Sequence, residues 1–187
     1  MDKKTNLFEN GRIMAATRSD EEFLRAISGS VEVIFDLDPD LMNISAKVKK
    51  AHEAGKKYLL HVDLAKGLGK DESGIRYLNR VGVDGVISTK VGIIRLARDQ
   101  GLLTVQRFFI VDSHSIDTTI ESVKASKPDM IEIMPGTICK VIERLQKRMD
   151  VPIIAGGLIE TEGEIKEILA SGAAAISTAR HELWELK

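Results

Sequence analysis

Residues 152–178 read PIIAGGLIETEGEIKEILASGAAAIST, and this stretch decides the fold. The apolar runs at its two ends predict two short buried strands. Between them, Thr161 and Glu164 have the spacing of a capping box, which predicts a helix that ends at Gly172. A strand, a helix and a second strand in this order are typical of a parallel strand pair joined by a helical crossover.

The same alternation runs along the whole chain. Short apolar runs bounded by Gly, Pro or polar residues predict eight strands, at 13–16, 31–37, 58–64, 86–90, 103–111, 130–134, 152–155 and 174–178. Helical periodicity and capping residues predict helices at 40–54, 71–81, 91–100, 113–126, 137–149, 161–172 and 180–186.

Regular alternation of strands and helices indicates a parallel sheet covered by helices. Eight such units favour closure into a small (β/α)8 TIM-type barrel with minimal loops, although 187 residues fall below the usual size of about 200. An open doubly wound sheet is the alternative. No linker divides the chain, so residues 1–187 are predicted to form a single barrel domain, with 1–10 as a flexible or loosely packed N-terminus.

Composition excludes several classes of function. The chain has 27 Lys and Arg against 28 Asp and Glu, and this balance excludes a strongly basic module that binds nucleic acid through bulk charge. No apolar run approaches the roughly 20 residues that cross a bilayer, and the polar start lacks the apolar core of a signal peptide. A single cysteine, Cys139, fits a reducing compartment. We therefore expect a cytoplasmic protein without membrane contact, and the sequence indicates neither a cofactor nor a metal site.

Several predicted strands carry polar residues near their carboxyl ends, where buried parallel strands are normally apolar. These residues are Arg18, Asp36, His61, Asp63, Ser88, Lys90, Gln106, Arg107 and Glu132. Charges buried against the helix layer would cost several kcal/mol. The side chains are therefore predicted to point into the barrel mouth, where such barrels hold their active sites. The alternative is an internal salt-bridge cluster, for instance Lys90 with Glu132 or Asp63.

The last two predicted strands end in residues suited to an anion. Gly156 and Gly157 follow the seventh strand, and glycines let backbone N–H groups approach a ligand closely. Ser177 and Thr178 end the eighth strand and add hydroxyls before a short helix. The pattern predicts a site for a small phosphorylated ligand, and the alternative is that the glycines only make a tight turn.

A basic stripe is the candidate surface for RNA. Lys140, Arg144, Lys147 and Arg148 fall on one face of the predicted helix at 137–149. Such a stripe is also typical of an ordinary solvated helix face.

Six motifs in register carry a resemblance to a known family. They are His61-Val62-Asp63-Leu64, Ile87-Ser88-Thr89-Lys90, Gln106-Arg107-Phe108-Phe109, Ile131-Glu132-Ile133-Met134-Pro135-Gly136, Ala155-Gly156-Gly157-Leu158-Ile159, and Ser177-Thr178 with Leu183-Trp184. In order and spacing the chain resembles the glycerol-3-phosphate-responsive antiterminators, the glycerol uptake operon regulators, from about Ile13 to Trp184.

The resemblance implies a regulator that senses glycerol 3-phosphate and binds leader mRNA, so that transcription reads into genes of glycerol uptake and metabolism. It implies phosphate contacts from Gly156, Gly157, Ser177 and Thr178, and polyol contacts from Asp63, Lys90, Gln106 and Glu132. Arg18, His61 and Arg107 would support the site. The chain departs from the family where Ala179-Arg180 stand in place of Ser-Asn, at the start of the first strand, and in the loop 65–70. Arg180 would either strengthen the phosphate site or alter which ligand fits.

Three functions therefore compete. The first is a regulator, possible as a homodimer that combines two basic patches. The second is an enzyme acting on a phosphorylated triose or sugar, with His61, Asp63 and Glu132 as acid–base groups and Lys90 as a Schiff-base lysine. The third is a barrel that binds phosphate compounds without acting on RNA.

Overall fold

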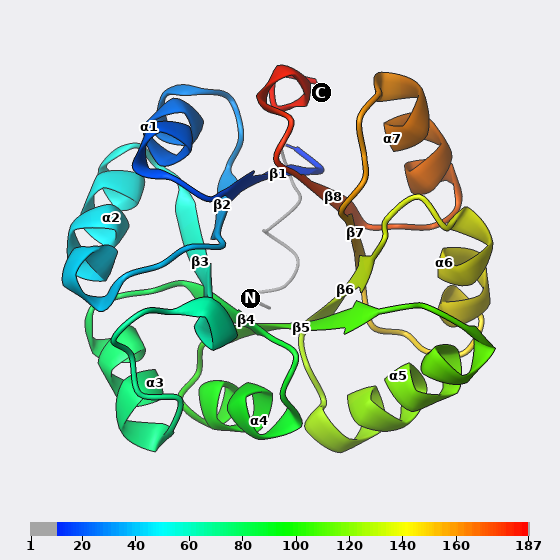
Figure 1. The fold of residues 1–187 in the computed structure, drawn as a ribbon, viewed down its shortest axis with the longest axis horizontal. Coiled ribbons are helices and arrows are strands. Elements are labelled where there is room, and N and C mark those ends of the chain that lie inside the picture. The colour runs from blue at the N-terminus through cyan, green and yellow to red at the C-terminus, as the bar shows by residue number, and fades with distance from the viewer. Residues whose placement is uncertain (1–10, 187) are drawn as a thin grey trace.

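The structure, a computed structural model, describes residues 11–186. Its eight strands form one closed barrel in the order β1 to β8, and all neighbours are parallel, including β8 against β1. Figure 1 looks down this barrel and shows the helices as an outer ring around the strands. The predicted (β/α)8 barrel is confirmed, and the open doubly wound sheet is excluded. The predicted flexible segment 1–10 lies outside the described residues.

Each predicted strand overlaps an observed one. The strands are β1 Ile13–Thr17, β2 Val33–Asp36, β3 Lys57–His61, β4 Gly85–Ser88, β5 Leu103–Phe109, β6 Met130–Met134, β7 Ile153–Gly156 and β8 Ala175–Thr178. The α-helices are α1 Asp20–Ser28, α2 Leu41–Glu53, α3 Glu72–Arg80, α4 Val91–Asp99, α5 Ser113–Ser126, α6 Cys139–Gln146 and α7 Glu162–Ala170, and the short 3-10 helices are η2 Val62–Leu64 and η3 His181–Leu183. Within residues 11–186, no helix is long and apolar enough to cross a bilayer.

Helix α1 is the one α-helix that sequence analysis did not place. Ser19 caps it by accepting a hydrogen bond from the backbone N–H of Glu22. Its first turn holds Asp20, Glu21 and Glu22, which suit the positive end of the helix dipole. The signal was therefore present as a Ser and a Glu three residues apart, the spacing of a capping box.

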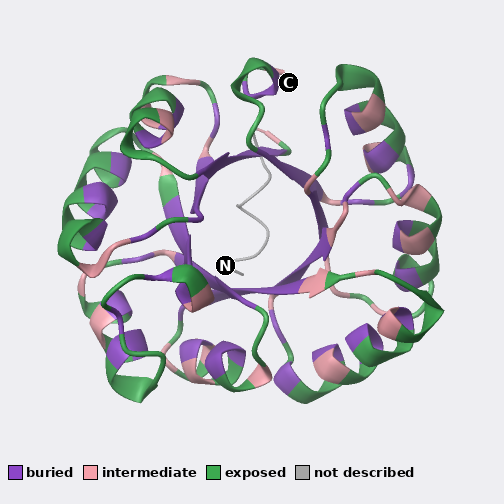
Figure 2. Cartoon of the chain, in the orientation of Figure 1, coloured by how far each residue is buried: buried purple, intermediate pink, exposed green. Residues whose placement is uncertain are grey.

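Strand alternation separates two apolar layers. One layer fills the barrel interior, with Met14, Phe35, Leu59, Val105 and Met130 among its buried members. The other lies between the strands and the helices and takes the intervening residues of the same strands. Figure 2 shows the buried strands and the buried inner faces of the helices that cover them. The interior is apolar at depth, so the polar residues that face inward gather towards its carboxyl end.

The C-terminal segment closes the ring without an eighth α-helix. In Figure 1, η3 lies between α7 and α1, where that helix would otherwise stand. Trp184 is buried, and its indole Nε1 donates to the Thr178 carbonyl at 2.9 Å. The Ser30 hydroxyl donates to the Trp184 carbonyl at 3.1 Å. One aromatic side chain thus fixes the end of β8, which carries part of the mouth.

The prediction that Asp36 points into the mouth is wrong. Its side chain faces outward, where it accepts hydrogen bonds from Lys47 Nζ at 2.9 Å and from the Tyr58 hydroxyl at 2.6 Å. Burial raises the pKa of Tyr58, and the nearby Asp36 carboxylate raises it further. Burial alone would lower the pKa of Lys47, but Asp36 and Asp20 outweigh it and raise that pKa. The charge is accommodated in the helix layer because α2 supplies its partner.

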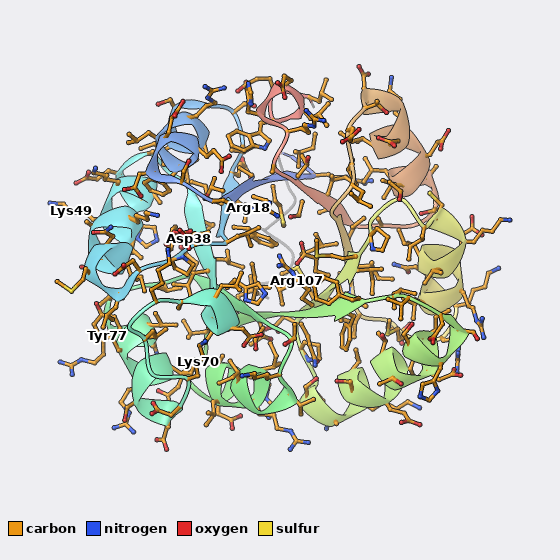
Figure 3. The ribbon with its side chains drawn as sticks, viewed as in Figure 1. Arg18, Asp38, Lys49, Lys70, Tyr77 and Arg107 are labelled. Carbon is orange, nitrogen blue, oxygen red and sulfur yellow. The ribbon has the colours of Figure 1, made fainter. Side chains whose placement is uncertain are left out.

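Replacement of Lys47 tests this buried pair. We expect Lys47→Ala to lower the free energy of unfolding by about 3 kcal/mol, because it leaves the Asp36 carboxylate buried without its cation. The control is Lys49→Ala on the same helix, whose side chain points outward in Figure 3 and is exposed. That change should stay within about 0.5 kcal/mol. Urea denaturation measures both, and equal effects would contradict the assigned role of Lys47.

Candidate functional site

A cavity of about 270 Å³ opens at the carboxyl ends of the strands. Its size suits a ligand smaller than a typical drug molecule. The lining residues come mainly from the ends of β1 and β5 to β8 and from the segments that follow them. They are Ala16, Arg18, Leu37, Arg107, Glu132, Met134, Gly157, Leu158, Ile159, Glu160, Ser177, Thr178, Ala179 and Arg180.

The connection after β7 has a constrained backbone. Gly157 has φ +75°, and a Cβ atom there would lie 2.7 Å from Met134 Cε. Leu158 also has positive φ, at 58°, which is unusual for a residue with a side chain, and it is 71% exposed. Strained residues of this kind persist where the surrounding structure imposes them, often at ligand sites.

Three of the four predicted phosphate residues line the cavity. Ser177 and Thr178 are buried at the end of β8, and Gly157 lies beside them after β7. The Thr178 hydroxyl donates to the Ile159 carbonyl at 3.2 Å, which ties the two segments together. Backbone and hydroxyl groups from both strands therefore meet at one side of the cavity, as the sequence pattern predicts for an anion site.

Gly156, the fourth, does not line the cavity. A Cβ atom at this position would lie 2.5 Å from Glu132 Oε1. Glycine is required there because the Glu132 carboxylate occupies the space that a side chain would need. The residue shapes the floor of the site through packing, a role that its sequence context did not reveal.

A buried ion pair forms that floor. Arg107 and Glu132 are direct neighbours on β5 and β6, and Arg107 Nε donates to Glu132 Oε2 at 2.6 Å. Their side chains are only 6% and 1% exposed. Figure 3 shows Arg107 pointing towards the centre of the ring of strands. The predicted alternative of a salt bridge is thus present, but Arg107 is the cation where the sequence analysis named Lys90.

The second carboxylate oxygen of Glu132, Oε1, is buried and has no hydrogen-bond partner among residues 11–186. An ionised carboxylate only accepts hydrogen bonds, so the group that suits Oε1 is a donor such as a hydroxyl. Buried acceptors without a donor are rare and costly in folded proteins. This atom marks the floor of the cavity as the place for a ligand donor.

Asp63 and Lys90 lie at the ends of β3 and β4, across the ring from β7 and β8 (Figure 1). Neither lines the cavity. Asp63 accepts hydrogen bonds from the Ser88 hydroxyl and from the N–H and hydroxyl of Thr89, each at 2.8 Å. Burial alone would raise the pKa of Asp63, but these hydrogen bonds outweigh it and lower that pKa. Lys90 is exposed and precedes α4.

The expectation that Gln106 faces the mouth is wrong. Gln106 is fully buried between β5 and α5, where its Nε2 donates to the Ser122 hydroxyl at 2.9 Å and its Oε1 accepts from Ser126. The strand alternates, so Gln106 and the adjacent Arg107 must face opposite layers. The helix supplies two hydroxyls that satisfy the amide, and these partners are not evident from the strand itself.

His61 is buried at the end of β3 and does not line the cavity. Burial lowers its pKa from 6.5 to about 4, and the positive charge of Arg107 adds to this effect. The imidazole is therefore neutral near pH 7, and its Nδ1 has no hydrogen-bond partner. Among residues 11–186, no three His, Cys, Asp or Glu side chains are grouped to hold a metal ion.

Two further charged residues lie at the mouth. Glu160 was not predicted as a site residue, whereas Arg180 was expected to strengthen the phosphate site or to alter which ligand fits. Glu160 and Arg180 both line the cavity and form an ion pair with 3.0 Å between Oε1 and Nη2. Within the described chain, the Arg18 guanidinium at the same cavity has no ion-pair or hydrogen-bond partner. Leu37 and Met134 add apolar walls. The sequence signal for Arg180 was its place after Ser177-Thr178, whereas Glu160 gave none.

The basic stripe is only partly helical. Helix α6 ends at Gln146, so Lys140 and Arg144 lie on it and Lys147 and Arg148 follow in the next turn. All four are exposed. Arg148 is paired with Asp117 on α5 at 2.7 Å, which reduces the charge it offers to a partner.

The fold and the cavity define a small (β/α)8 barrel with a cavity at its carboxyl mouth. Residues 13–184 match the family described as glycerol-3-phosphate responsive antiterminator, and the chain belongs to this family. The glycerol uptake operon antiterminator regulatory protein of Listeria monocytogenes has 33% identity and a TM-score of 0.91, over 96% of this chain and 98% of that one. A glycerol uptake operon antiterminator-related protein of Thermotoga maritima has 32% identity and a TM-score of 0.83, over 93% and 98%.

The chain is also 35% identical over 182 residues to the uncharacterized protein YgcP of Escherichia coli K12, which covers 97% of this chain and 95% of that one. A solved aldolase with 12% identity has a TM-score of 0.71. That likeness shows the barrel alone, because one barrel fold supports many unrelated functions.

The buried His61 predicts a pH dependence of stability. Its pKa in the folded protein, about 4, lies below the ordinary 6.5, so the unfolded chain binds the proton more readily between these values. Stability should fall as the pH drops from 6.5 to 4, by up to about 3 kcal/mol from this group. In His61→Gln this part of the decline should be absent, as measured by urea denaturation at several pH values. The control is His114→Gln, at an exposed position on α5, which should keep the wild-type decline. Equal declines in wild type and His61→Gln would contradict the prediction.

Proposed function

We propose that this protein is a transcription antiterminator controlled by glycerol 3-phosphate, which it binds at the barrel mouth, and that it acts on leader mRNA of glycerol uptake and metabolism genes. The observation that carries the proposal is the cavity itself. A glycine turn, the Ser177 hydroxyl and the Arg18 guanidinium line it together with Glu132. Among residues 11–186, neither the Arg18 guanidinium nor the buried Oε1 of Glu132 has a partner. Family membership and the two solved relatives, both related to glycerol uptake operon antiterminators, support the same role.

The phosphate end of the ligand lies against the ends of β7 and β8 in this proposal. Gly157 brings the backbone close, and Ser177 offers its hydroxyl. The Thr178 hydroxyl donates to the Ile159 carbonyl and so holds the end of β8 beside this turn. Arg18 adds a positive charge that is not used by another described residue. Hydrogen bonds between charged groups and phosphate are among the stronger ones available to a protein.

The polyol end lies over the Arg107–Glu132 pair. A ligand hydroxyl donates to Glu132 Oε1, which has no donor in the free protein. The Arg107 guanidinium keeps Glu132 in place from the other side. Asp63 and Lys90 stand across the ring, and in this proposal Asp63 holds the β4–α4 connection in place through its bonds to Ser88 and Thr89.

Ligand binding controls RNA binding by favouring one state of the protein over another. The proposed RNA surface is the exposed basic stripe of Lys140, Arg144, Lys147 and Arg148. One protomer has a formal charge of only −1, so two copies that combine their stripes would bind RNA more strongly. Action on leader RNA places the protein in the cytoplasm.

No contact of the site favours an enzyme instead. A Schiff-base lysine needs a desolvated pocket, whereas Lys90 is exposed and lies outside the cavity. Neither His61 nor Asp63 lines the cavity, so two of the three candidate acid–base groups are separated from a ligand there.

Calorimetric titration with glycerol 3-phosphate tests the ligand. We expect saturable binding, with glycerol and inorganic phosphate binding at least tenfold more weakly because each supplies half of the contacts. Gly157→Asp should abolish binding, because it places a carboxylate beside the phosphate. The matched control is Gly55→Asp, at φ +72° with nothing near its Cβ, which should bind as wild type does. Turnover of the ligand in the titrated sample, or no binding, would contradict the proposal.

Charge reversal on α6 tests the RNA surface. In Lys140→Glu/Arg144→Glu we expect RNA affinity to fall, with a salt slope lower by about 2 because two phosphate contacts are lost. The readout is filter binding of leader RNA at several salt concentrations, with and without glycerol 3-phosphate. The control, Lys49→Glu/Lys50→Glu on α2, changes the net charge equally. An equal loss in both variants would show that α6 is not the RNA surface.

A further inference from the structure

The mouth holds an ion pair that the ligand site as proposed does not use. Arg180 follows β8 and Glu160 follows β7, and both line the cavity. Their side chains are 54% and 60% exposed. Exposed ion pairs contribute little to the stability of a protein, so either residue can leave this pair for a stronger partner at a small cost in free energy.

The two backbones that carry the pair are well fixed. The N–H of Arg180 donates to the Thr178 hydroxyl at 3.1 Å, and Trp184 anchors the same segment. On the other side, the N–H of Glu160 donates to Glu164 at 2.8 Å, within the capping box of α7. The pair therefore bridges two anchored segments at the edge of the cavity.

The cavity offers few unpaired positive charges to an anionic ligand. Arg107 forms a buried ion pair with Glu132, and Arg180 forms an exposed ion pair with Glu160. Arg18 alone of the three lining arginines has no described partner. A phosphate monoester carries a charge of about −1.5 to −2 near pH 7. The single charge of Arg18 does not balance the charge of the phosphate. Arg180 can supply a second positive charge, because its exposed ion pair with Glu160 is easily broken.

We propose that Arg180 binds the ligand phosphate and that Glu160 competes with the ligand for Arg180. In the free protein the Glu160 carboxylate is paired with the Arg180 guanidinium. When the ligand binds, its phosphate replaces Glu160 as the partner of Arg180. An anion must therefore interact with Arg180 more strongly than Glu160 does in order to bind. Glu160 thus selects against anions that interact weakly with the guanidinium. The inference rests on the proposed phosphate site and adds to it Glu160, which the sequence did not assign, as the competitor for Arg180.

A double-mutant cycle tests the competition, with affinity for glycerol 3-phosphate and for inorganic phosphate measured by calorimetry. We expect Glu160→Gln to bind glycerol 3-phosphate about threefold more tightly, since it removes an exposed competitor. Arg180→Gln should bind at least tenfold more weakly, since it removes a charged contact to phosphate. In Arg180→Gln, the additional change Glu160→Gln should have no effect, because Glu160 acts through Arg180.

The control for net charge is Glu162→Gln. Glu162 lies two residues further along, is 54% exposed, and is paired with Lys166 on α7 at 2.6 Å. The substitution Glu162→Gln removes one negative charge from the same region, but Glu162 does not line the cavity. We therefore expect wild-type affinity for glycerol 3-phosphate. Thermal unfolding of each variant shows that the fold is retained.

The outcomes separate the two proposals. The competition is overturned if Arg180→Gln binds with unchanged affinity. It is also overturned if the gain from Glu160→Gln persists in the Arg180→Gln background, or if Glu162→Gln gives an equal gain. Such results leave glycerol 3-phosphate as ligand if wild type binds it. If wild type binds inorganic phosphate with the expected cycle but not glycerol 3-phosphate, the competition stands and the proposed ligand fails. Binding of neither overturns both.

Discussion

The buried contact between Arg107 and Glu132 sets the shape of the mouth. It joins β5 to β6 at the level where the apolar interior ends. Two ionised groups at this depth require each other, since either one alone would be a costly buried charge. The carboxylate in turn occupies the space over Gly156, and the guanidinium helps to keep His61 neutral. A substitution at any of these positions therefore acts on the whole floor of the site.

The barrel places its two kinds of polar residue by strand alternation. Inward-facing Glu132 and Arg107 reach the cavity, whereas outward-facing Asp36 and Gln106 are satisfied by helices. The helix layer thus accepts polar groups where a neighbouring helix supplies a matched partner, Lys47 for Asp36 and two serines for Gln106. A polar residue in a barrel strand is not by itself evidence of a ligand site. What distinguishes the lining of the cavity is Glu132 Oε1, a buried acceptor that receives no hydrogen bond from residues 11–186.

The mouth combines a rigid frame with exchangeable charges. Trp184 and the capping box of α7 fix the segments after β8 and β7. The charged side chains that these segments carry are partly exposed and paired weakly. Such an arrangement suits the proposed reversible binding of a small anion, because the backbone is preorganised while exposed ion pairs can exchange partners.

Hydrophobic periodicity and capping signals are local, and they were enough to predict the number, order and type of nearly all elements. Gly157, Ser177 and Thr178 were also correctly placed at the mouth, because they follow strands whose carboxyl ends must meet. Which polar side chains face the cavity became clear only in the folded barrel. The side that a polar residue faces depends on register and on partners from other elements, so Gln106 faces α5, and Gly156 and Lys90 lie outside the lining of the cavity. The contact of Arg180 with Glu160 was equally hidden, because the two residues lie 20 apart in sequence and meet only when β7 and β8 become neighbours.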